Sequence, residues 1–279
     1  RFTSSKEARD YRVDKNAELV ELLKQKKKVS AMRRPDNNPR VGDDHRKGKD
    51  ATSELFSKTF GFRGVQFGNW VEGIKRQNDL NYAFDGLMDL ASVIGVPVKA
   101  LSLNGQLGLA FGARGKGGQD SAAAHYEPDS VVINLTKKQG SGSLAHEWFH
   151  ALDNYFAKMD NESVGEQKSA FLTDSSRKTS VLKDGMYQRS NTDDFGVRPE
   201  VYDAFRRVTS SIKNETNLVK RSAKRDEFRT KNYWSTVIEM TARSFERYVI
   251  GKLEQGGYES DYLANIVKES STTATDEMS

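Results

Sequence analysis

The sequence predicts an α+β fold in which a small mixed sheet packs on one amphipathic helix and later helices surround it. Residues 130–136 (SVVINLT) form an apolar, β-branched run of the length typical of a strand. After a turn rich in glycine and serine, residues 142–156 (GSLAHEWFHALDNYF) repeat apolar residues at helical spacing. A second long helical pattern occupies residues 234–253. A strand, the helix that follows it and a later helix that can pack on it are the basis of this prediction.

The remaining elements follow from periodicity and from glycine or proline at their ends. Residues 70–94 carry the longest helical pattern, interrupted near Asn78 and ended by Gly95. Residues 107–113 (LGLAFGA) predict a further strand, and the polar segment 157–198 predicts a long loop or insertion. Shorter helices are expected at residues 17–28, 51–60, 200–213 and 261–268.

Composition excludes several classes of protein. The 279 residues include no cysteine, which excludes disulfides, zinc ribbons and thiol nucleophiles. No apolar run approaches the roughly 20 residues that a membrane span requires. Residues 1–12 (RFTSSKEARDYR) lack the apolar core of a signal peptide. We therefore expect no membrane partner and a cytoplasmic location.

The uneven distribution of charge suggests how the chain is divided. Residues 1–50 hold 15 Lys and Arg against 9 Asp and Glu, whereas the remainder holds 29 against 30. We expect a basic polar arm or linker at residues 1–50, a folded domain at residues 51–269 and a disordered tail at residues 270–279. The arm suits non-specific contact with DNA or with an acidic partner. A solvated linker or surface helix is the simpler alternative.

The helix at residues 142–156 carries the pattern H-E-x-x-H. His146 and His150 are four residues apart, so both imidazoles lie on one helix face and can reach one ion. Glu147 points toward the same place without being a ligand, and a glutamate there can act as general base toward water. A structural helix with polar positions is the alternative. The preceding strand and small-residue turn favour the metal site, because this layout is the one expected of zinc peptidases.

A catalytic zinc ion requires a third protein ligand. The favoured donor is Glu239, in residues 233–249 (YWSTVIEMTARSFERYV). A glutamate from a later helix can pack across the two histidines and complete the site. The alternative for Glu239 is an ordinary Glu–Arg–Glu ladder along a helix surface.

Three other residues are weaker candidates as ligands. Asp153 follows His150 by three residues, but it lies about 10 Å along the helix from His146. That distance suits a carboxylate that holds an imidazole better than a third ligand. His125 precedes the strand at 130–136 and can line the cleft, and His45 lies in the charged linker.

Four segments resemble, in order, the large polyvalent protein-associated domain of phages and conjugative elements. They are FGFRGVQFGNWV, SLNGQLGLAFGARGKGG, AHYEPDSVVINLT and GSLAHEWFHALDNYF. The segment EMTARSFERYV resembles a later helix of the same family, with the pattern E-x-x-A-R-x-F-E. The resemblance covers roughly residues 46–250 and leaves residues 1–45 and the extreme carboxyl terminus outside it.

The resemblance implies a zincin-like metallopeptidase fold, with Zn²⁺ bound by His146, His150 and Glu239 and with Glu147 catalytic. It also implies delivery into the cytoplasm of a bacterial host with phage or plasmid DNA, as part of a larger polyprotein or virion, and action against host defence. This chain has Arg243 at a position where related zinc peptidases often have an aspartate that accepts a hydrogen bond from a zinc-binding histidine. Arginine cannot accept a hydrogen bond from an imidazole, so the groups around the ligands must differ.

Two functions stay open on this basis. The favoured one is a zinc peptidase that cleaves a protein or peptide substrate with Glu147 as base. The other is a non-catalytic module of a virion or transfer complex with a structural metal site, or a nucleic-acid-associated domain that uses the basic arm. The group that would stabilise an oxyanion is also open, among Tyr126, Tyr233, Tyr248 and His125.

Overall fold

The computed structural model separates two compact units, Arg1–Met32 and Arg33–Ser279. The first contains helix α1 (Ser5–Asp14), which begins where the Ser4 side chain accepts a hydrogen bond from the backbone of Glu7. The other elements described below belong to the larger unit. The structure describes residues 3–18, 33–34, 37–68, 73–112, 124–135, 142–161, 170–174, 180–183, 186–189, 197–227 and 229–266.

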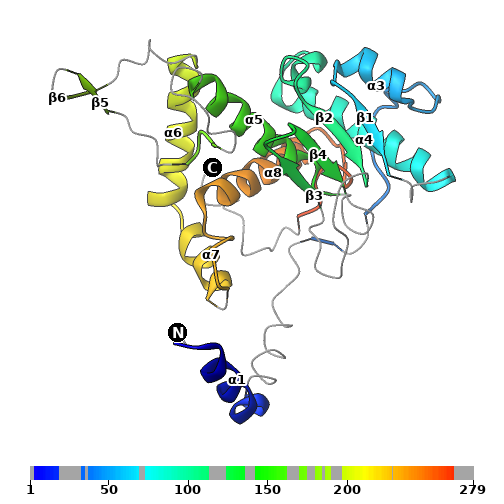
Figure 1. The fold of residues 1–279 in the computed structure, drawn as a ribbon. Coiled ribbons are helices and arrows are strands. Elements are labelled where there is room, and N and C mark those ends of the chain that lie inside the picture. The colour runs from blue at the N-terminus through cyan, green and yellow to red at the C-terminus, as the bar shows by residue number, and fades with distance from the viewer. Residues whose placement is uncertain are drawn as a thin grey trace. The chain divides into compact units, whose positions relative to one another are not determined.

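A four-stranded mixed sheet has the order β1-β2-β4-β3, as Figure 1 shows. Its strands are β1 (Val65–Phe67), β2 (Gly108–Phe111), β3 (Ala124–Glu127) and β4 (Val132–Leu135). Strands β1, β2 and β4 are parallel, and β3 pairs antiparallel with β4 at the edge. Every residue of β2 and β4 is buried, the pattern of strands that are covered on both faces. The predicted α+β class with a small mixed sheet is confirmed.

Seven helical segments follow α1 in the described part of the chain. They are α3 (Ser53–Phe60), α4 (Gly73–Ile94), η1 (Val98–Ser102), α5 (Leu144–Asn161), α6 (Pro199–Asn214), α7 (Leu218–Asp226) and α8 (Val237–Gln255). A separate hairpin consists of β5 (Ser180–Lys183) and β6 (Met186–Arg189). None of the described helices combines the length and the apolar character that crossing a membrane requires.

An aromatic core joins the sheet to α3 and α4. The ring of Phe56 in α3 lies 5.4 Å from that of Phe84 in α4 and 6.4 Å from that of Phe111 in β2. Helix α3 ends at Gly61, whose φ of 73° is in the left-handed region that glycine adopts without steric cost. The same core continues to Leu144 of α5, so both histidines follow a rigidly packed helix start.

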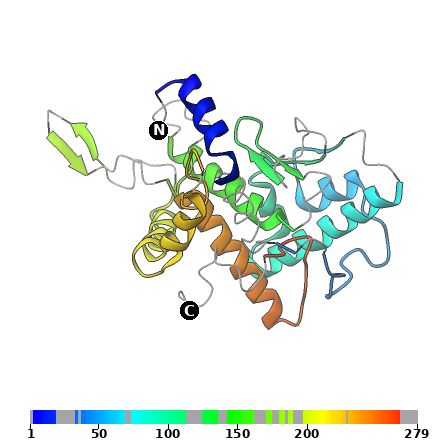
Figure 2. The same ribbon diagram turned by 90° about the horizontal axis from the view of Figure 1, so that it is seen from below.

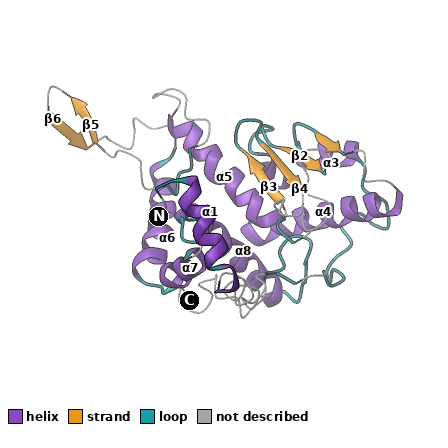
Figure 3. Cartoon of the chain, turned by 60° about the horizontal axis from the view of Figure 1, so that its bottom comes forward, coloured by secondary structure: helices purple, strands orange, loops and turns teal. Residues whose placement is uncertain are grey.

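Helices α5 and α8 lie side by side, as the views in Figures 1 to 3 agree and as their contacts show. Phe245 of α8 packs against two aromatic residues of α5, with ring centroids 5.0 Å from Phe149 and 5.9 Å from Trp148. Helix α5 also packs on β3 and β4. The predicted arrangement, with α5 on the sheet and a later helix beside it, is therefore present.

Two local predictions are wrong. Helix α4 runs unbroken through Asn78. The helix expected at residues 261–268 is absent from its described part, because residues 261–263 form a turn and Ile266 forms a β-bridge with Arg33. The Asp261 carboxylate accepts hydrogen bonds from the Arg34 side chain. An ion pair between residues far apart in the sequence therefore replaces local helix formation. Residues 19–28 of the first predicted helix and the predicted tail at 270–279 lie outside the described residues.

The larger unit begins earlier than composition predicts, at Arg33 instead of residue 51. Two aspartates of α4, Asp85 and Asp89, are only 4% and 3% exposed. Arg40 binds Asp89 with Nε and NH2 at 2.8 and 2.7 Å, and Arg46 Nε lies 3.1 Å from Asp85. These arginines neutralise buried carboxylates, which ties the basic segment after Arg33 to the folded unit.

Candidate metal centre

Three side chains from two helices converge at one point. His146 and His150 lie in the first two turns of α5, and Glu239 lies in the first turn of α8. The two histidine Nε2 atoms are 3.1 Å apart. The Glu239 carboxylate faces both, with Oε2 3.4 Å from His146 Nε2 and Oε1 3.4 Å from His150 Nε2. The structure thus brings together the three residues that the sequence proposes as ligands.

The separations of these atoms are similar to those between the ligand atoms of one tetrahedral zinc ion, and each histidine faces a different oxygen of Glu239. Metal–ligand bonds of about 2.0–2.1 Å place neighbouring ligand atoms of a tetrahedral zinc site about 3.3 Å apart. The separations between the three side chains are 3.1, 3.4 and 3.4 Å. Two imidazoles and one carboxylate are also ligands that zinc accepts, and three protein ligands leave a fourth position for water or substrate. The donor set therefore fits zinc in its chemistry, and the three side chains lie close enough together to share one ion.

Packing of α5 directs its histidines toward α8. Trp148, between the two histidines, donates a hydrogen bond from Nε1 to the Leu101 carbonyl at 3.0 Å and is buried. Phe149 packs on Phe245. Since His146 and His150 are four residues apart, they lie one turn apart on one face of α5, and both face Glu239 of α8.

A buried aspartate holds the chain that leads into α8. The Asp226 carboxylate accepts hydrogen bonds at 2.7 to 3.1 Å from the backbone N–H groups of Tyr233, Trp234 and Ser235 and from the Ser235 hydroxyl. Burial raises the pKa of Asp226, but these hydrogen bonds outweigh burial and lower it below its usual value. Thr236 then caps the helix that carries Glu239. Glu239 therefore stands on a preorganised helix start.

Electrostatics favour a proton in the cluster when no metal is bound. Burial lowers the pKa of His146, but Glu239 and Glu246 outweigh burial and raise it to about 9. Burial also raises the pKa of Glu239, yet its contacts with His146 and His150 hold it well below the usual value. A metal ion must consequently displace a proton in order to bind at neutral pH.

Glu246 and Arg33 are neighbours of the cluster that sequence reasoning missed. Glu246 Oε2 lies 3.5 Å from His146 Nδ1, the ring nitrogen that does not face Glu239. The guanidinium of Arg33 contacts both oxygens of Glu246. The sequence signal for Glu246 is its place two helical turns after Glu239. No local pattern points to Arg33, because its partners lie far away along the chain.

Asp153 holds a neighbouring loop and not an imidazole. Its Oδ1 accepts a hydrogen bond from the Thr173 backbone at 2.9 Å, and its Oδ2 accepts one from the Thr173 hydroxyl at 2.5 Å. Burial raises the pKa of Asp153 to about 6, although Thr173 and the charge of His150 oppose the rise. Among the described residues, Nδ1 of His146 and Nδ1 of His150 are both buried and have no hydrogen-bond partner.

Arg243 contacts the proposed glutamate ligand, whereas the two remaining histidines lie outside the cluster. Arg243 NH1 lies 3.6 Å from Glu239 Oε2. His125 Nε2 lies 3.0 Å from Glu127 in β3, and His45 Nε2 lies 3.0 Å from Asp89. Arg243 is thus part of the surroundings of the ligands, and the cluster includes neither His125 nor His45.

Glu147 and Tyr233 supply further groups beside the cluster. Glu147 follows His146 in α5 and is 7% exposed. Burial, the charges of Glu239 and Glu147, and a hydrogen bond with Glu239 all raise the pKa of Tyr233 above its ordinary value. The Tyr233 hydroxyl therefore lies beside the Glu239 carboxylate, and a phenol can donate a hydrogen bond.

Two other tyrosines are engaged elsewhere. Tyr126 donates to Asn154 at 2.8 Å in the interior. Tyr248 is 48% exposed, and the Lys252 ammonium lies 5.8 Å from its ring centroid. Of the groups that the sequence leaves open as oxyanion donors, Tyr233 is the one that interacts with a residue of the cluster.

Two family descriptions match the ends of the chain. Large polyvalent protein-associated domain 5 matches residues 1–59, and Large polyvalent protein-associated domain 1 matches residues 225–277. These matches support the resemblance to large polyvalent protein-associated domains. The expectation that residues 1–45 and the carboxyl terminus lie outside it is wrong. The second match includes Glu239, and neither includes α5. No curated protein and no solved structure matches the chain.

Proposed function

We propose that this chain contains a zincin-like peptidase domain, in which His146, His150 and Glu239 hold a zinc ion. This proposal rests on the convergence of two imidazole Nε2 atoms and one carboxylate at separations of 3.1 to 3.4 Å. Three ligands are typical of catalytic zinc, because structural sites use four. The glutamate that follows the first histidine distinguishes a peptidase from other zinc-binding helices.

The chemistry divides among few groups. Zinc, when bound, supplies a Lewis acid that lowers the pKa of water and polarises a carbonyl group. Glu147 accepts the proton of the attacking water and later delivers it to the leaving amine. Tyr233 donates a hydrogen bond to the oxyanion that develops on the scissile carbonyl. Its hydrogen bond with Glu239 supports this role, because the hydroxyl then lies beside the cluster.

The edge of the sheet offers a place for an extended substrate. In the described part of the chain, β3 has a neighbouring strand on one side only, and it lies against α5. An extended peptide can pair with such an edge through backbone hydrogen bonds, with specificity from alternate side chains. We infer that the substrate is a protein or peptide that lies along β3.

The two family matches support a setting in a polyvalent protein of a mobile element. In this setting the domain would enter a bacterial cytoplasm with phage or plasmid DNA and cleave a host protein that acts in defence. A non-catalytic module with a structural zinc ion is the competing function. A measurement of peptide cleavage separates the two functions. Zinc content alone does not, because both functions include a bound zinc ion.

The decisive experiment compares Glu147→Gln with His146→Ala. Cleavage is measured on a proteome-derived peptide library by mass spectrometry, and zinc by elemental analysis. We expect wild type to hold about one zinc ion per chain. Glu147→Gln should keep zinc and lose cleavage by on the order of 10²- to 10⁴-fold, and His146→Ala should lose both. Glu200→Gln, at an exposed glutamate of α6, is the matched control and should retain both.

The pattern across the variants identifies the function. Zinc that is kept with equal cleavage in wild type and Glu147→Gln would show that Glu147 is not the base, and cleavage by zinc-free His146→Ala would show that zinc is not catalytic. If cleavage of the library is absent even in wild type, the same variants are compared by the phenotype of the element in its host. Loss in His146→Ala with full function in Glu147→Gln would then rule out the peptidase.

A further inference from the structure

Arg33 brings a positive charge into the interior beside the cluster. It is the first residue of the larger unit, and 16% of its side chain is exposed. NH1 contacts Oε1 of Glu246, and NH2 donates to Oε2 at 2.8 Å. NH1 also donates to the carbonyl of Gly142, just before α5 begins. One side chain therefore contacts α8 and the residue that leads into α5, the two helices that carry the cluster.

Glu246 extends this contact to a histidine. Its side chain is 0% exposed, and its Oε2 lies 3.5 Å from His146 Nδ1. The other nitrogen of that ring faces Glu239. A histidine that binds metal through one nitrogen usually donates the N–H of the other to an acceptor, which fixes the orientation of the ring. A small rotation of the imidazole would bring Nδ1 within the roughly 2.7–3.2 Å of a hydrogen bond to Glu246.

The Gly142 contact holds the start of α5 from a second direction. Gly142 has a φ of 100°, and a Cβ added there would lie 2.4 Å from Cγ of Asn265. Its carbonyl accepts a hydrogen bond from the Asn265 backbone at 3.3 Å as well as the one from Arg33. The residue before α5 is thus enclosed between Arg33 and Asn265, and α5 cannot shift without breaking the Arg33 contact.

We propose that Arg33 is a positioning residue of the metal site, acting on His146 through Glu246 and on α5 through Gly142. This inference rests on the proposed binding of zinc. Its physical basis is that a buried carboxylate needs a charge partner and well-formed hydrogen bonds to stay in one place. Without Arg33, Glu246 would lose the cation that orients it, and the carboxylate 3.5 Å from His146 Nδ1 would no longer be held in one position.

The consequence concerns the amino-terminal segment. Arg33 lies in the match to Large polyvalent protein-associated domain 5, and Glu246 lies in the match to Large polyvalent protein-associated domain 1. The first matched segment is therefore part of the machinery that binds metal. A chain shortened past Arg33 should bind zinc weakly although it retains all three ligands.

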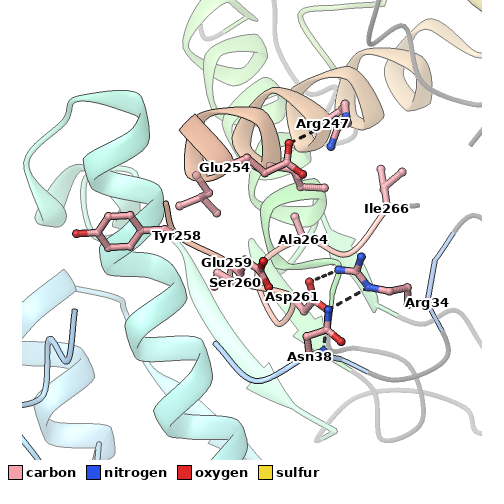
Figure 4. A pocket seen from close by; sticks show the side chains of 12 residues that line it. Arg34, Asn38, Arg247, Glu254, Tyr258, Glu259, Ser260, Asp261, Ala264 and Ile266 are labelled. Atoms are coloured by element: carbon pink, nitrogen blue, oxygen red, sulfur yellow. Dashed lines mark hydrogen bonds and ion pairs between the residues drawn. The ribbon is translucent and has the colours of Figure 1, made fainter. Parts of the chain in front are cut away.

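Arg34 provides a matched control, as Figure 4 shows. It is the next residue, and it contacts both oxygens of Asp261, as Arg33 contacts both oxygens of Glu246. Arg34 and Asp261 line a cavity of about 120 Å³, and the residues around this cavity include none of the three proposed ligands. Loss of either arginine would loosen the same segment, but only loss of Arg33 should disturb His146.

The experiment compares Arg33→Gln with Arg34→Gln in the full chain, after circular dichroism has shown that both are folded. Zinc affinity is measured by competition with a chelating dye, and the ligand geometry by the visible spectrum of bound Co²⁺. Arg33→Gln should weaken zinc binding by about 10- to 100-fold and change the Co²⁺ spectrum. Arg34→Gln should leave both unchanged. Arg33→Lys keeps the positive charge but cannot reproduce the contacts of a guanidinium with both carboxylate oxygens. Its zinc affinity should therefore lie between those of the two glutamine variants.

Each outcome has a defined meaning. Equal loss of zinc affinity in the two glutamine variants would show that Arg33 only tethers the segment, which overturns the proposal. If Arg33→Gln does not fold, Arg33→Lys and Glu246→Gln take its place, and full zinc affinity in both overturns the proposal. A wild-type chain that binds no zinc would overturn the metal site itself, which is recognisable because no variant then differs from wild type.

Discussion

The guanidinium of Arg243 lies 3.6 Å from the Glu239 carboxylate, one helical turn earlier in α8. Arg243 is fully buried, and its NH2 also donates to the Trp234 carbonyl at 2.5 Å. A buried cation beside the proposed ligand favours the ionised carboxylate that a metal requires. It also links the stability of the metal-free protein to Glu239.

We predict that Glu239→Ala and Glu239→Gln separate metal binding from folding. Both should lose most of the zinc, because neither supplies an anionic ligand. Glu239→Ala removes an acidic neighbour of Arg243 and should lower the free energy of unfolding of the zinc-free protein by on the order of 3 kcal/mol. Glu239→Gln retains a polar group of the same shape and should cost less. Elemental analysis and urea titration measure the two effects, and full zinc in either variant would exclude Glu239 as a ligand.

Zinc binding should strengthen as pH rises from about 6.5 toward 9. In the metal-free fold the pKa of His146 is raised to about 9, so near pH 7 zinc must displace this proton. We expect release of about one proton per zinc ion at pH 7, measured by calorimetry in buffers of different ionisation enthalpy. Glu246→Gln removes a carboxylate that raises this pKa and should shift the rise in affinity to lower pH. An affinity that is flat across this range would contradict the raised pKa.

The same shift affects the stability of the metal-free protein. A folded pKa above the unfolded value of about 6.5 means that the fold binds the proton more tightly than the unfolded chain does. The contribution of His146 is therefore complete below about pH 6.5 and is lost as pH rises through about 9. Urea titrations with a chelator present should show this loss in wild type, and it should be absent from His146→Gln.

Asp153→Asn should change the pH dependence of stability without removing the metal. The pKa of Asp153 is raised from 3.8 to about 6 by burial, so its contribution to stability is present below pH 4 and is lost as pH rises through 6. An asparagine can still bond to both groups of Thr173. At pH 8 the variant should therefore match or exceed wild type in unfolding free energy, by on the order of 1–3 kcal/mol. A variant that loses zinc would instead give Asp153 a part in holding a ligand.

Asp226→Ala should loosen the start of α8. It removes the acceptor of four hydrogen bonds to the segment before Thr236. The cost should be on the order of 2–3 kcal/mol, because buried N–H groups lose their partner. Asp226→Asn keeps one acceptor oxygen and should cost less. Both are measured by urea titration, and equal stability of all three proteins would show that Asp226 does not organise this segment.

Any non-specific DNA binding should depend on residues 1–32 and fall steeply with salt. The basic run there includes Lys24, Lys26, Lys27 and Lys28. Deleting residues 1–50 would confound the test, because Arg40 and other residues of that stretch neutralise buried carboxylates. The clean variants are a chain without residues 1–32 and one with the four lysines changed to Gln. Salt-resistant DNA binding by either would favour the nucleic-acid function.

Local spacing along the chain was sufficient to predict part of the candidate site. The i, i+4 positions of His146 and His150 place both imidazoles on one helix face wherever that helix lies. The strand at Val132–Leu135 and helices α5 and α8 follow from periodicity, which is a property of neighbouring residues. The choice of Glu239 came from chemistry and resemblance, and in the structure its two carboxylate oxygens lie 3.4 Å from Nε2 of His146 and of His150.

The pairing of charged residues, in contrast, depends on contacts between segments that are distant in the sequence. Arg33 belongs by composition to a basic arm, yet its guanidinium contacts Glu246 of α8. Asp153 seemed by spacing a partner for a histidine, yet both its oxygens bind Thr173. Ion pairs carry no period along the sequence, because any arginine can neutralise any buried carboxylate that the fold brings within reach. Periodic patterns therefore predicted the main helices and the two histidines of the cluster, whereas long-range packing selected the charged groups that surround them.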